Sequence, residues 1–197
     1  AKGAPSPDAL VASAQRAIAE DDFETLVSCL WPETRDAWLA DLLVELAVES
    51  TDAGHEPDHD KRARQAEVRR ILGEYGATLQ KKPSGLTQGT LGKHLVESAT
   101  DRVGLYAALL RFAATRRASF DPPRAITGAN EASSSSVPLL RLTARLAPPA
   151  ALEPPPDGGV VAPPPTEGPF AVFLVGSGGP AVLRMRASGG AYWLDES

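Results

Sequence analysis

Cysteine, methionine and asparagine are nearly absent from this chain of 197 residues, since each occurs once. The single cysteine, Cys29, excludes an intrachain disulfide framework. No apolar run approaches the roughly 20 residues that a helix needs to cross a bilayer, so the sequence predicts no transmembrane segment. A chain of this size buries about 70% of the surface that it exposes when unfolded, so a hydrophobic core suffices to hold the fold.

The chain also lacks a net basic charge, because 25 acidic residues outnumber 20 basic ones. The charges are unevenly spread: residues 1–60 hold 14 acidic and 3 basic side chains, whereas residues 61–120 hold 4 and 12. A basic block is one feature of nucleic-acid binding. We interpret the two blocks instead as neighbouring surfaces that neutralise each other, because a DNA-binding domain usually has a net basic field. We therefore expect no nucleic-acid partner.

Alanine, arginine and proline are abundant, with 32, 15 and 18 copies, against only 5 lysines. These residues have GC-rich codons, which indicates a GC-rich bacterial source. Residues 1–6 are mostly small residues with one proline and have no leading methionine, as in the spacer that follows a cleavage site. We therefore expect a flexible N-terminal tail over residues 1–6 and an extracytoplasmic location, either periplasmic or secreted. A lipid anchor upstream of residue 1 is left open.

Apolar residues recur with helical spacing through the first part of the chain. Ser6 and Pro7 are a typical cap and first residue of a helix. The apolar stripes predict about six helices within residues 7–118, beginning near residues 7, 23, 32, 57, 91 and 100. The last of these, which Thr100 is expected to cap, is apolar over much of its circumference, so we expect it to be central.

The pattern changes after residue 120, where 13 of the 18 prolines lie and apolar residues alternate with polar ones. Residues 140–146 alternate strictly and predict a half-buried strand. Residues 170–175 are apolar throughout, as in a strand covered on both faces. These, residues 181–187 and residues 192–194 predict a three-stranded meander closed by a tight turn at Ser188-Gly189-Gly190. A weaker pattern predicts a further strand at residues 124–127.

Residues 147–169 contain nine prolines and three glycines, a composition that cannot form a sheet ladder. We interpret this segment as a mobile insertion between two paired strands, with a ligand for a proline-recognising partner as the alternative. The prediction is therefore a single α+β domain over residues 7–197. Its helical part, residues 7–118, packs on a C-terminal antiparallel sheet of three to four strands within residues 124–195.

The segment His55-Glu56-Pro57-Asp58-His59 matches the H-E-x-x-H pattern of zinc peptidases. That chemistry needs both histidines on one helical face, with the glutamate activating a metal-bound water. Pro57 is more typical of a helix start, which leaves His55 outside the helix. The flanking residues are polar and no third ligand is evident. We favour adventitious surface metal binding and assign no catalytic, cofactor-binding or metal residue. Cys29 is interpreted as a small buried apolar residue.

Two stretches resemble secreted bacterial proteins of the nuclear-transport-factor-two-like superfamily. The first spans residues 6–43 and contains Ala19-Glu20-Asp21-Asp22-Phe23 and Leu30-Trp31-Pro32-Glu33-Thr34-Arg35. The second is Gly190-Ala191-Tyr192-Trp193-Leu194-Asp195. The resemblance implies a cone in which N-terminal helices pack into a curved antiparallel sheet. The superfamily includes lyases, isomerases and many non-catalytic binding or accessory domains. The helices beginning near residues 57, 91 and 100 and the insertion at 147–169 are additions to that pattern.

No residues match the catalytic His–Asp pair of the enzymatic members, so fold alone licenses no activity. The first hypothesis is a non-catalytic extracytoplasmic domain that binds a protein partner or a small ligand. The second is a cone-fold lyase or isomerase whose pocket is lined by Trp31, Trp38 or Tyr106. The third is a structural component of a larger assembly. No cofactor is expected under the first hypothesis.

Overall fold

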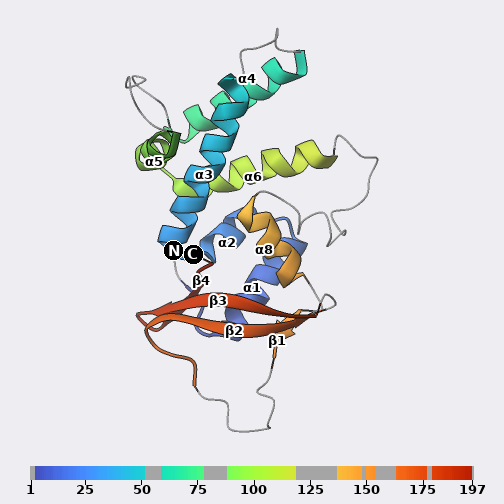
Figure 1. The fold of residues 1–197 in the computed structure, drawn as a ribbon, viewed down its shortest axis with the longest axis vertical. Helices are drawn as coiled ribbons and strands as arrows, with labels where there is room; N and C mark the ends of the chain where they lie inside the picture. The colour runs from blue at the N-terminus through green and yellow to red at the C-terminus, as the bar shows by residue number, and fades with distance from the viewer. Residues whose placement is uncertain are drawn as a thin grey trace. The chain divides into compact units, whose positions relative to one another are not determined.

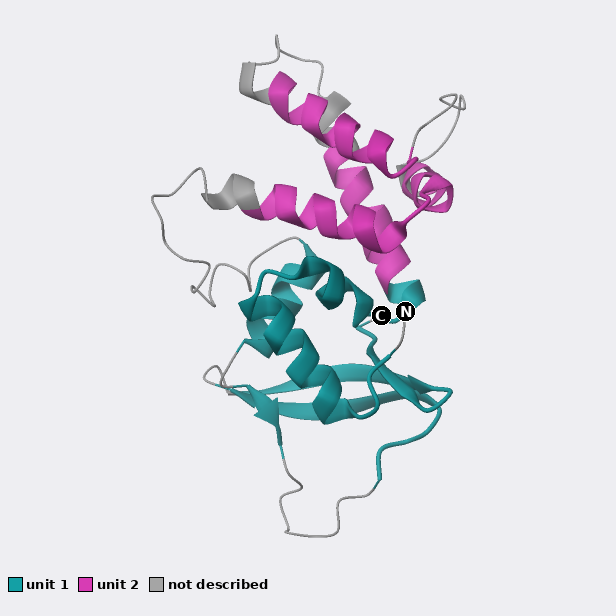
Figure 2. Ribbon diagram, turned by 180° about the vertical axis from the view of Figure 1, so that it is seen from behind, with its two compact units in different colours: residues 1–34, 121–197 teal, residues 35–120 magenta. Residues whose placement is uncertain are grey.

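The structure is a computed structural model that describes residues 3–51, 59–77, 88–118, 137–147, 150–153, 163–176 and 179–196. Within these ranges the chain forms seven helices and a four-stranded antiparallel sheet (Figure 1). Most helices precede the strands, which confirms the predicted α+β class. The chain divides into two compact units: unit 1 holds Ala1–Thr34 and Asp121–Ser197, and unit 2 holds Arg35–Phe120 (Figure 2). The single domain expected over residues 7–197 stays a prediction.

Unit 1 begins with two helices whose caps follow from the sequence. Helix α1 (Pro7–Ala19) starts after Ser6, whose Oγ accepts a hydrogen bond of 3.1 Å from the backbone N–H of Ala9. Helix α2 (Phe23–Ser28) starts after Asp22, whose carboxylate accepts from the backbone N–H of Thr25 at 3.1 Å. Each cap satisfies a backbone donor that has no partner inside its helix. The predicted start of the chain's first helix is thus confirmed.

The sheet of unit 1 is an antiparallel meander in the order β1-β2-β3-β4. Its strands are β1 (Ala151–Leu152), β2 (Gly168–Gly176), β3 (Gly179–Ser188) and β4 (Ala191–Leu194). The turn between β3 and β4 holds Gly189 and Gly190 at φ values of 57° and 77°, a conformation that glycine adopts without steric cost. This turn pairs Ser188 with Ala191 and Arg186 with Trp193. The predicted three-stranded meander and its hairpin are confirmed.

The core of unit 1 lies between one face of this sheet and its helices. Helix α1 contacts α2, β1, β4 and a further helix, α8 (Pro138–Leu146). Alternate residues of β3, together with residues of α1, are buried: Leu183, Met185, Ala187, Leu10 and Ala14. Since side chains of a strand point alternately to its two faces, the other face of the sheet carries Val182, Arg184 and Arg186. This second face is called the outer sheet face below.

Residues 140–146 do not form the predicted strand. They lie in helix α8 (Pro138–Leu146), which Pro138 opens at its first turn. The buried residues of α8 are Leu139, Leu142 and Leu146, a helical spacing of three and four. A strand period of two and a helix period of 3.6 both place Leu142 and Leu146 on one face, so their spacing does not distinguish a strand from a helix. The burial of Leu139 does, because it fits only the helical period. The strand predicted at residues 124–127 lies outside the described residues.

The described part of the segment 147–169 contains sheet structure as well. Ala151 and Leu152 form β1 and pair with Val175 and Leu174. The amide of Gln15 on α1 donates to the carbonyl oxygens of Leu146 and Ala150, at 2.9 and 2.5 Å. These bonds tie the end of α8 and the start of β1 to α1. Strand β1 therefore lies inside the segment that was predicted as an insertion, and the expectation that this segment connects two paired strands is wrong, because helix α8 precedes it.

Unit 2 is helical in its described part. Helix α3 (Pro32–Thr51) begins in unit 1 and continues into unit 2, which also holds α4 (His59–Glu74), α5 (Gln88–Ser98) and α6 (Arg102–Ala118). Helices α3 and α5 approach closely at Gly92, where a Cβ would lie 2.5 Å from the carbonyl oxygen of Ala40. Asp101, not the predicted Thr100, caps α6, since its carboxylate accepts from the backbone N–H of Gly104 at 3.0 Å. Thr100 instead donates to the carbonyl oxygen of Tyr75.

The acidic and basic blocks of the sequence meet in unit 2. Residues 35–120 hold 13 basic and 12 acidic side chains, so this unit is close to neutral even though residues 61–120 are strongly basic. The ion pair between Arg102 and Asp36 joins one residue of each block. These observations agree with the interpretation that the two blocks neutralise each other.

The helical register of α8 predicts which leucine carries the stability of unit 1. Leu139→Ala should lower the free energy of unfolding by about 2–5 kcal/mol, because Leu139 is fully buried. The matched control Leu140→Ala, at a half-buried position, should cost less than about 1 kcal/mol. Urea unfolding followed by circular dichroism measures both. A larger loss for Leu140→Ala than for Leu139→Ala would contradict the helix and support the strand predicted at residues 140–146.

Candidate functional site

The two stretches that carry the superfamily resemblance meet in unit 1, although nearly 150 residues lie between them in the sequence. The backbone N–H of Leu194 donates to the carbonyl oxygen of Cys29, and that of Trp31 donates to the carbonyl oxygen of Leu194, each at 2.8 Å. Leu30 thereby forms a parallel bridge with Leu194. On the same edge, Ala4 exchanges two backbone hydrogen bonds with Tyr192. These contacts pair the outer edge of β4, which protects it from pairing with other chains.

A buried carboxylate joins these stretches through their side chains. Asp195 follows β4, and its side chain is 2% exposed. One carboxylate oxygen accepts a hydrogen bond of 2.5 Å from Thr34 Oγ1, and the other accepts one of 2.7 Å from Arg186 Nε. A carboxylate withdrawn from water is costly unless it is paired and hydrogen-bonded. Asp195 meets both conditions, so the pair stabilises this junction and orients Arg186.

Two indole rings complete the cluster. The rings of Trp31 and Trp193 meet edge to face, with centroids 5.2 Å apart and planes inclined at 72°. The guanidinium carbon of Arg186 lies 5.1 Å from the centroid of the Trp31 ring, within range of a cation–π interaction. The Nε1 atoms of both tryptophans are buried and have no hydrogen-bond partner among the residues that the structure describes. We call Trp31, Thr34, Arg186, Trp193 and Asp195 the indole–arginine cluster.

The outer sheet face also exposes apolar side chains. Phe173, Val175 and Val182 are 56%, 43% and 47% exposed, and Phe173 lies directly opposite Val182 in the register. The expectation that residues 170–175 form a strand covered on both faces is therefore wrong, because only alternate residues of β2 are covered. Arg184 and Arg186 follow Val182 on the same side of β3. The outer sheet face thus combines an apolar group of side chains with arginines.

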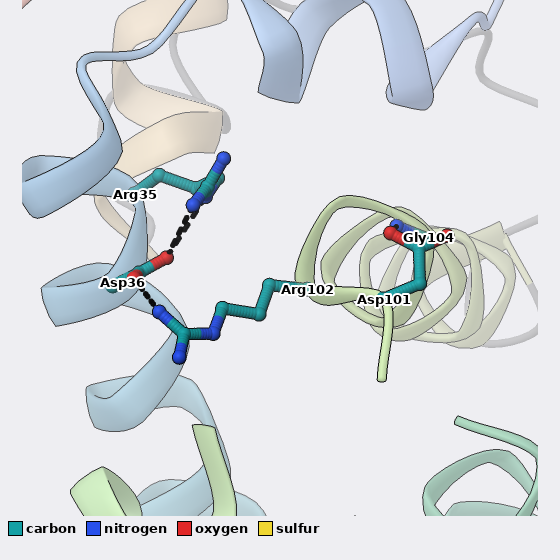
Figure 3. A network of polar contacts seen from close by, with 5 residues as sticks. All are labelled: Arg35, Asp36, Asp101, Arg102 and Gly104. Carbon is teal, nitrogen blue, oxygen red and sulfur yellow. Dashed lines mark hydrogen bonds and ion pairs between the residues drawn. The ribbon is translucent and has the colours of Figure 1, made fainter. Parts of the chain in front are cut away.

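A second polar network lies in unit 2 (Figure 3). Asp36 on α3 accepts hydrogen bonds from Arg35 Nε at 2.9 Å and from Arg102 Nη1 of α6 at 2.5 Å. The carboxylate of Asp101 points to Gly104 and not to this pair, as Figure 3 shows. The network joins the first turns of α3 and α6, so we assign it a structural role within unit 2.

Tyr106 on α6 is fully buried, and within the described ranges its hydroxyl has no hydrogen-bond partner. Burial raises the pKa of the Tyr106 phenol, and the negative charge of Asp41 raises it further. A hydroxyl without a partner in the interior lowers stability, because it lost its hydrogen bonds to water on folding. The neighbouring residues Leu105, Ala107 and Leu109 are also fully buried, as expected for a helix that is apolar over much of its surface.

The residues that the sequence singled out are placed as follows. His55, Glu56, Pro57 and Asp58 lie outside the described residues, and His59 is described only as the first residue of α4. Within the described ranges, no three histidine, cysteine, aspartate or glutamate side chains gather to hold a metal ion. Cys29 is buried, and desolvation raises the pKa of its thiol despite a hydrogen bond with Ser13.

The pocket proposed for an enzyme draws on residues of both units. Trp31 belongs to unit 1 and to the indole–arginine cluster, whereas Trp38 and Tyr106 belong to unit 2. Sequence reasoning missed Arg186, Thr34 and Asp195. One contact could be predicted from the sequence, because a two-residue turn at Gly189-Gly190 sets Arg186 opposite Trp193. No local pattern indicates that Trp31 and Thr34 join them.

Comparison of the chain with protein-family models, curated proteins and solved structures gave no match. The superfamily resemblance therefore stays a prediction. Among the helices in the described part of the chain, none has the length and apolarity that crossing a membrane requires.

The indole–arginine cluster predicts an effect of its central carboxylate on stability. Asp195→Asn should lower the free energy of unfolding by about 2 kcal/mol, because Arg186 loses a charge-assisted hydrogen bond at a buried position. The control Glu167→Gln changes an exposed carboxylate that accepts one backbone hydrogen bond, and should cost less than about 1 kcal/mol. Urea unfolding at pH 7 measures both, and equal losses would contradict a special role of Asp195.

The unpartnered hydroxyl of Tyr106 predicts a stabilising substitution. Tyr106→Phe should raise the free energy of unfolding at pH 7 by about 1 kcal/mol, because it removes a buried donor without a partner. Folding raises the pKa of this phenol, so the unfolded chain loses the phenol proton more readily than the folded one. The free energy of unfolding is therefore unaffected by this group below its unfolded pKa of about 10, and falls as the pH rises further. Tyr106→Phe should therefore also reduce the loss of stability above pH 10.

Urea titrations at pH 7 and at pH 10.5 test both parts of this prediction. The control Tyr75→Phe changes a half-buried tyrosine of the same unit and should leave the alkaline loss in place. A destabilised Tyr106→Phe variant at pH 7 would show instead that the hydroxyl has a partner in solution.

Proposed function

We propose that this chain is a non-catalytic extracytoplasmic binding domain, and that the outer sheet face of unit 1 binds a protein partner. The exposure of Phe173, Val175 and Val182 carries the proposal, because three large apolar side chains lie together on adjacent strands. Grouped apolar side chains on a protein surface mark interaction sites, whereas isolated ones are common. The extracytoplasmic location is proposed from the resemblance of residues 6–43 and 190–195 to secreted bacterial proteins.

The chemistry of the partner follows from the composition of this face. Its apolar part favours a surface that buries side chains against Phe173 and Val182, and a fully buried large apolar side chain contributes about 1.5–3 kcal/mol. Its arginines, Arg184 and Arg186, favour carboxylates beside that apolar part. The partner proposed here is therefore a polypeptide that presents apolar side chains next to acidic ones.

Site-specific photo-crosslinking tests the proposal. A photoreactive phenylalanine analogue replaces Phe173 in the full chain, and the same analogue at Arg69, which is exposed on α4, is the matched control. In extracts of the organism that encodes the chain, position 173 should capture one identified protein that position 69 does not. That protein, once purified, should bind the unmodified chain, and Val182→Glu should weaken the binding at least tenfold.

Val182→Glu should leave the fold intact, because Val182 is nearly half exposed, and circular dichroism checks this. Equal capture at both positions, or equal affinity for the chain with and without Val182→Glu, would contradict the proposal.

A further inference from the structure

The guanidinium of Arg186 is held in one orientation by two different contacts. Its Nε donates to the buried carboxylate of Asp195 at 2.7 Å, and its carbon lies 5.1 Å from the centroid of the Trp31 ring. Asp195 is itself held by Thr34. An arginine side chain normally loses considerable rotamer freedom when it binds a ligand. For Arg186 folding has already removed most of that freedom, so a ligand would meet a preorganised group.

The terminal amino groups of Arg186 remain available as donors. Its hydrogen bond to Asp195 uses Nε, and within the described part of the chain Nη1 and Nη2 make no hydrogen bond. The side chain is 30% exposed and lies on the outer sheet face, so solvent reaches it. The two indole N–H groups beside it, those of Trp31 and Trp193, also find no acceptor in the part of the chain that the structure describes. The cluster therefore has more donors than acceptors, although Asp195 balances the charge of Arg186.

We propose that Arg186 binds a carboxylate group through Nη1 and Nη2. A carboxylate presents two oxygens in one plane, at a spacing that matches paired N–H groups of a guanidinium. Arg184, two residues along the same side of β3, adds a second positive charge. The acid that follows Asp195 in the chain, Glu196, is engaged by Arg145 at 2.8 Å and by the backbone N–H of Arg184 at 2.9 Å.

The carboxylate has two sources that share this chemistry. It belongs either to the polypeptide partner or to a small free carboxylate. Val182 and Arg186 are four residues apart on β3, so at about 3.3 Å per residue their Cα atoms are about 13 Å apart. A peptide with an acidic residue a few positions from its apolar side chains spans this distance, whereas acetate reaches only Arg186.

Tryptophan fluorescence of the full chain tests the site. In a Trp38→Phe background the emission comes from Trp31 and Trp193, both in contact with the proposed site. Titration with sodium acetate at constant ionic strength should give a saturable change, and the neutral isostere acetamide should not. Arg186→Gln should weaken the response at least tenfold. The matched control Arg141→Gln, which changes an exposed arginine of α8, should leave it unchanged.

A second variant covers the event that Arg186→Gln does not fold. Arg186→Lys keeps a positive charge beside Asp195 but removes the planar pair of donors, so it should fold and still weaken acetate binding severalfold. No saturable change with acetate, or the same change with acetamide or with Arg186→Lys, would overturn the proposal.

A peptide arm distinguishes the two sources. The probes are acetyl-Val-Ala-Val-Ala-Glu-amide and its glutamine counterpart. Tighter binding of the glutamate peptide than of acetate, lost with Val182→Glu, assigns the carboxylate to a polypeptide. Equal affinities for the glutamate peptide and for acetate assign the carboxylate to a small ligand. Because Val182→Glu should not affect acetate, the site at Arg186 remains testable even if crosslinking at residue 173 finds no partner.

Discussion

The pairing of residues 29–34 with the end of β4 is the constraint on which unit 1 depends. Two backbone hydrogen bonds join Cys29 and Trp31 to Leu194, and the Thr34 hydroxyl reaches the Asp195 carboxylate beyond them. The chain leaves unit 1 directly after Thr34 and returns only at residue 121. These contacts therefore secure the segment from which unit 2 departs. Without them, β4 would present an unpaired edge and Asp195 a buried charge with one partner fewer.

The same contacts give the outer sheet face its chemical character. Arg186 neutralises Asp195. Its cation–π contact with Trp31 and its partial exposure give it a fixed and accessible set of donors. Along β3 the arginines follow Val182, whose neighbour Phe173 is more than half exposed. A structural ion pair and a candidate recognition group are thus one residue. Its substitution affects both roles, which is why conservative replacements separate them best.

Local chemistry made several elements predictable. A serine before proline caps α1, and two consecutive glycines close the β3–β4 hairpin, because few other residues suit those backbone positions. The prediction of a strand at residues 140–146 failed because the strand period and the helix period place the same leucines on one face. Leu142 and Leu146 fit a strand and a helix equally, and the burial of Leu139 was decided by the packing of α8 within unit 1. Prediction failed again at Phe173, because an apolar run does not reveal which of its faces a sheet leaves uncovered.

The amino-acid sequence determined the α+β class, the helix starts, the hairpin turn and thus the register that sets Arg186 opposite Trp193. These depend on contacts between residues close in the chain, where propensity and periodicity act. Only the tertiary structure brought Trp31 and Thr34 to Arg186 and Asp195 and left one sheet face open. Those outcomes depend on which distant segments pack against the same apolar surface, and no local sequence pattern indicates which of them will do so.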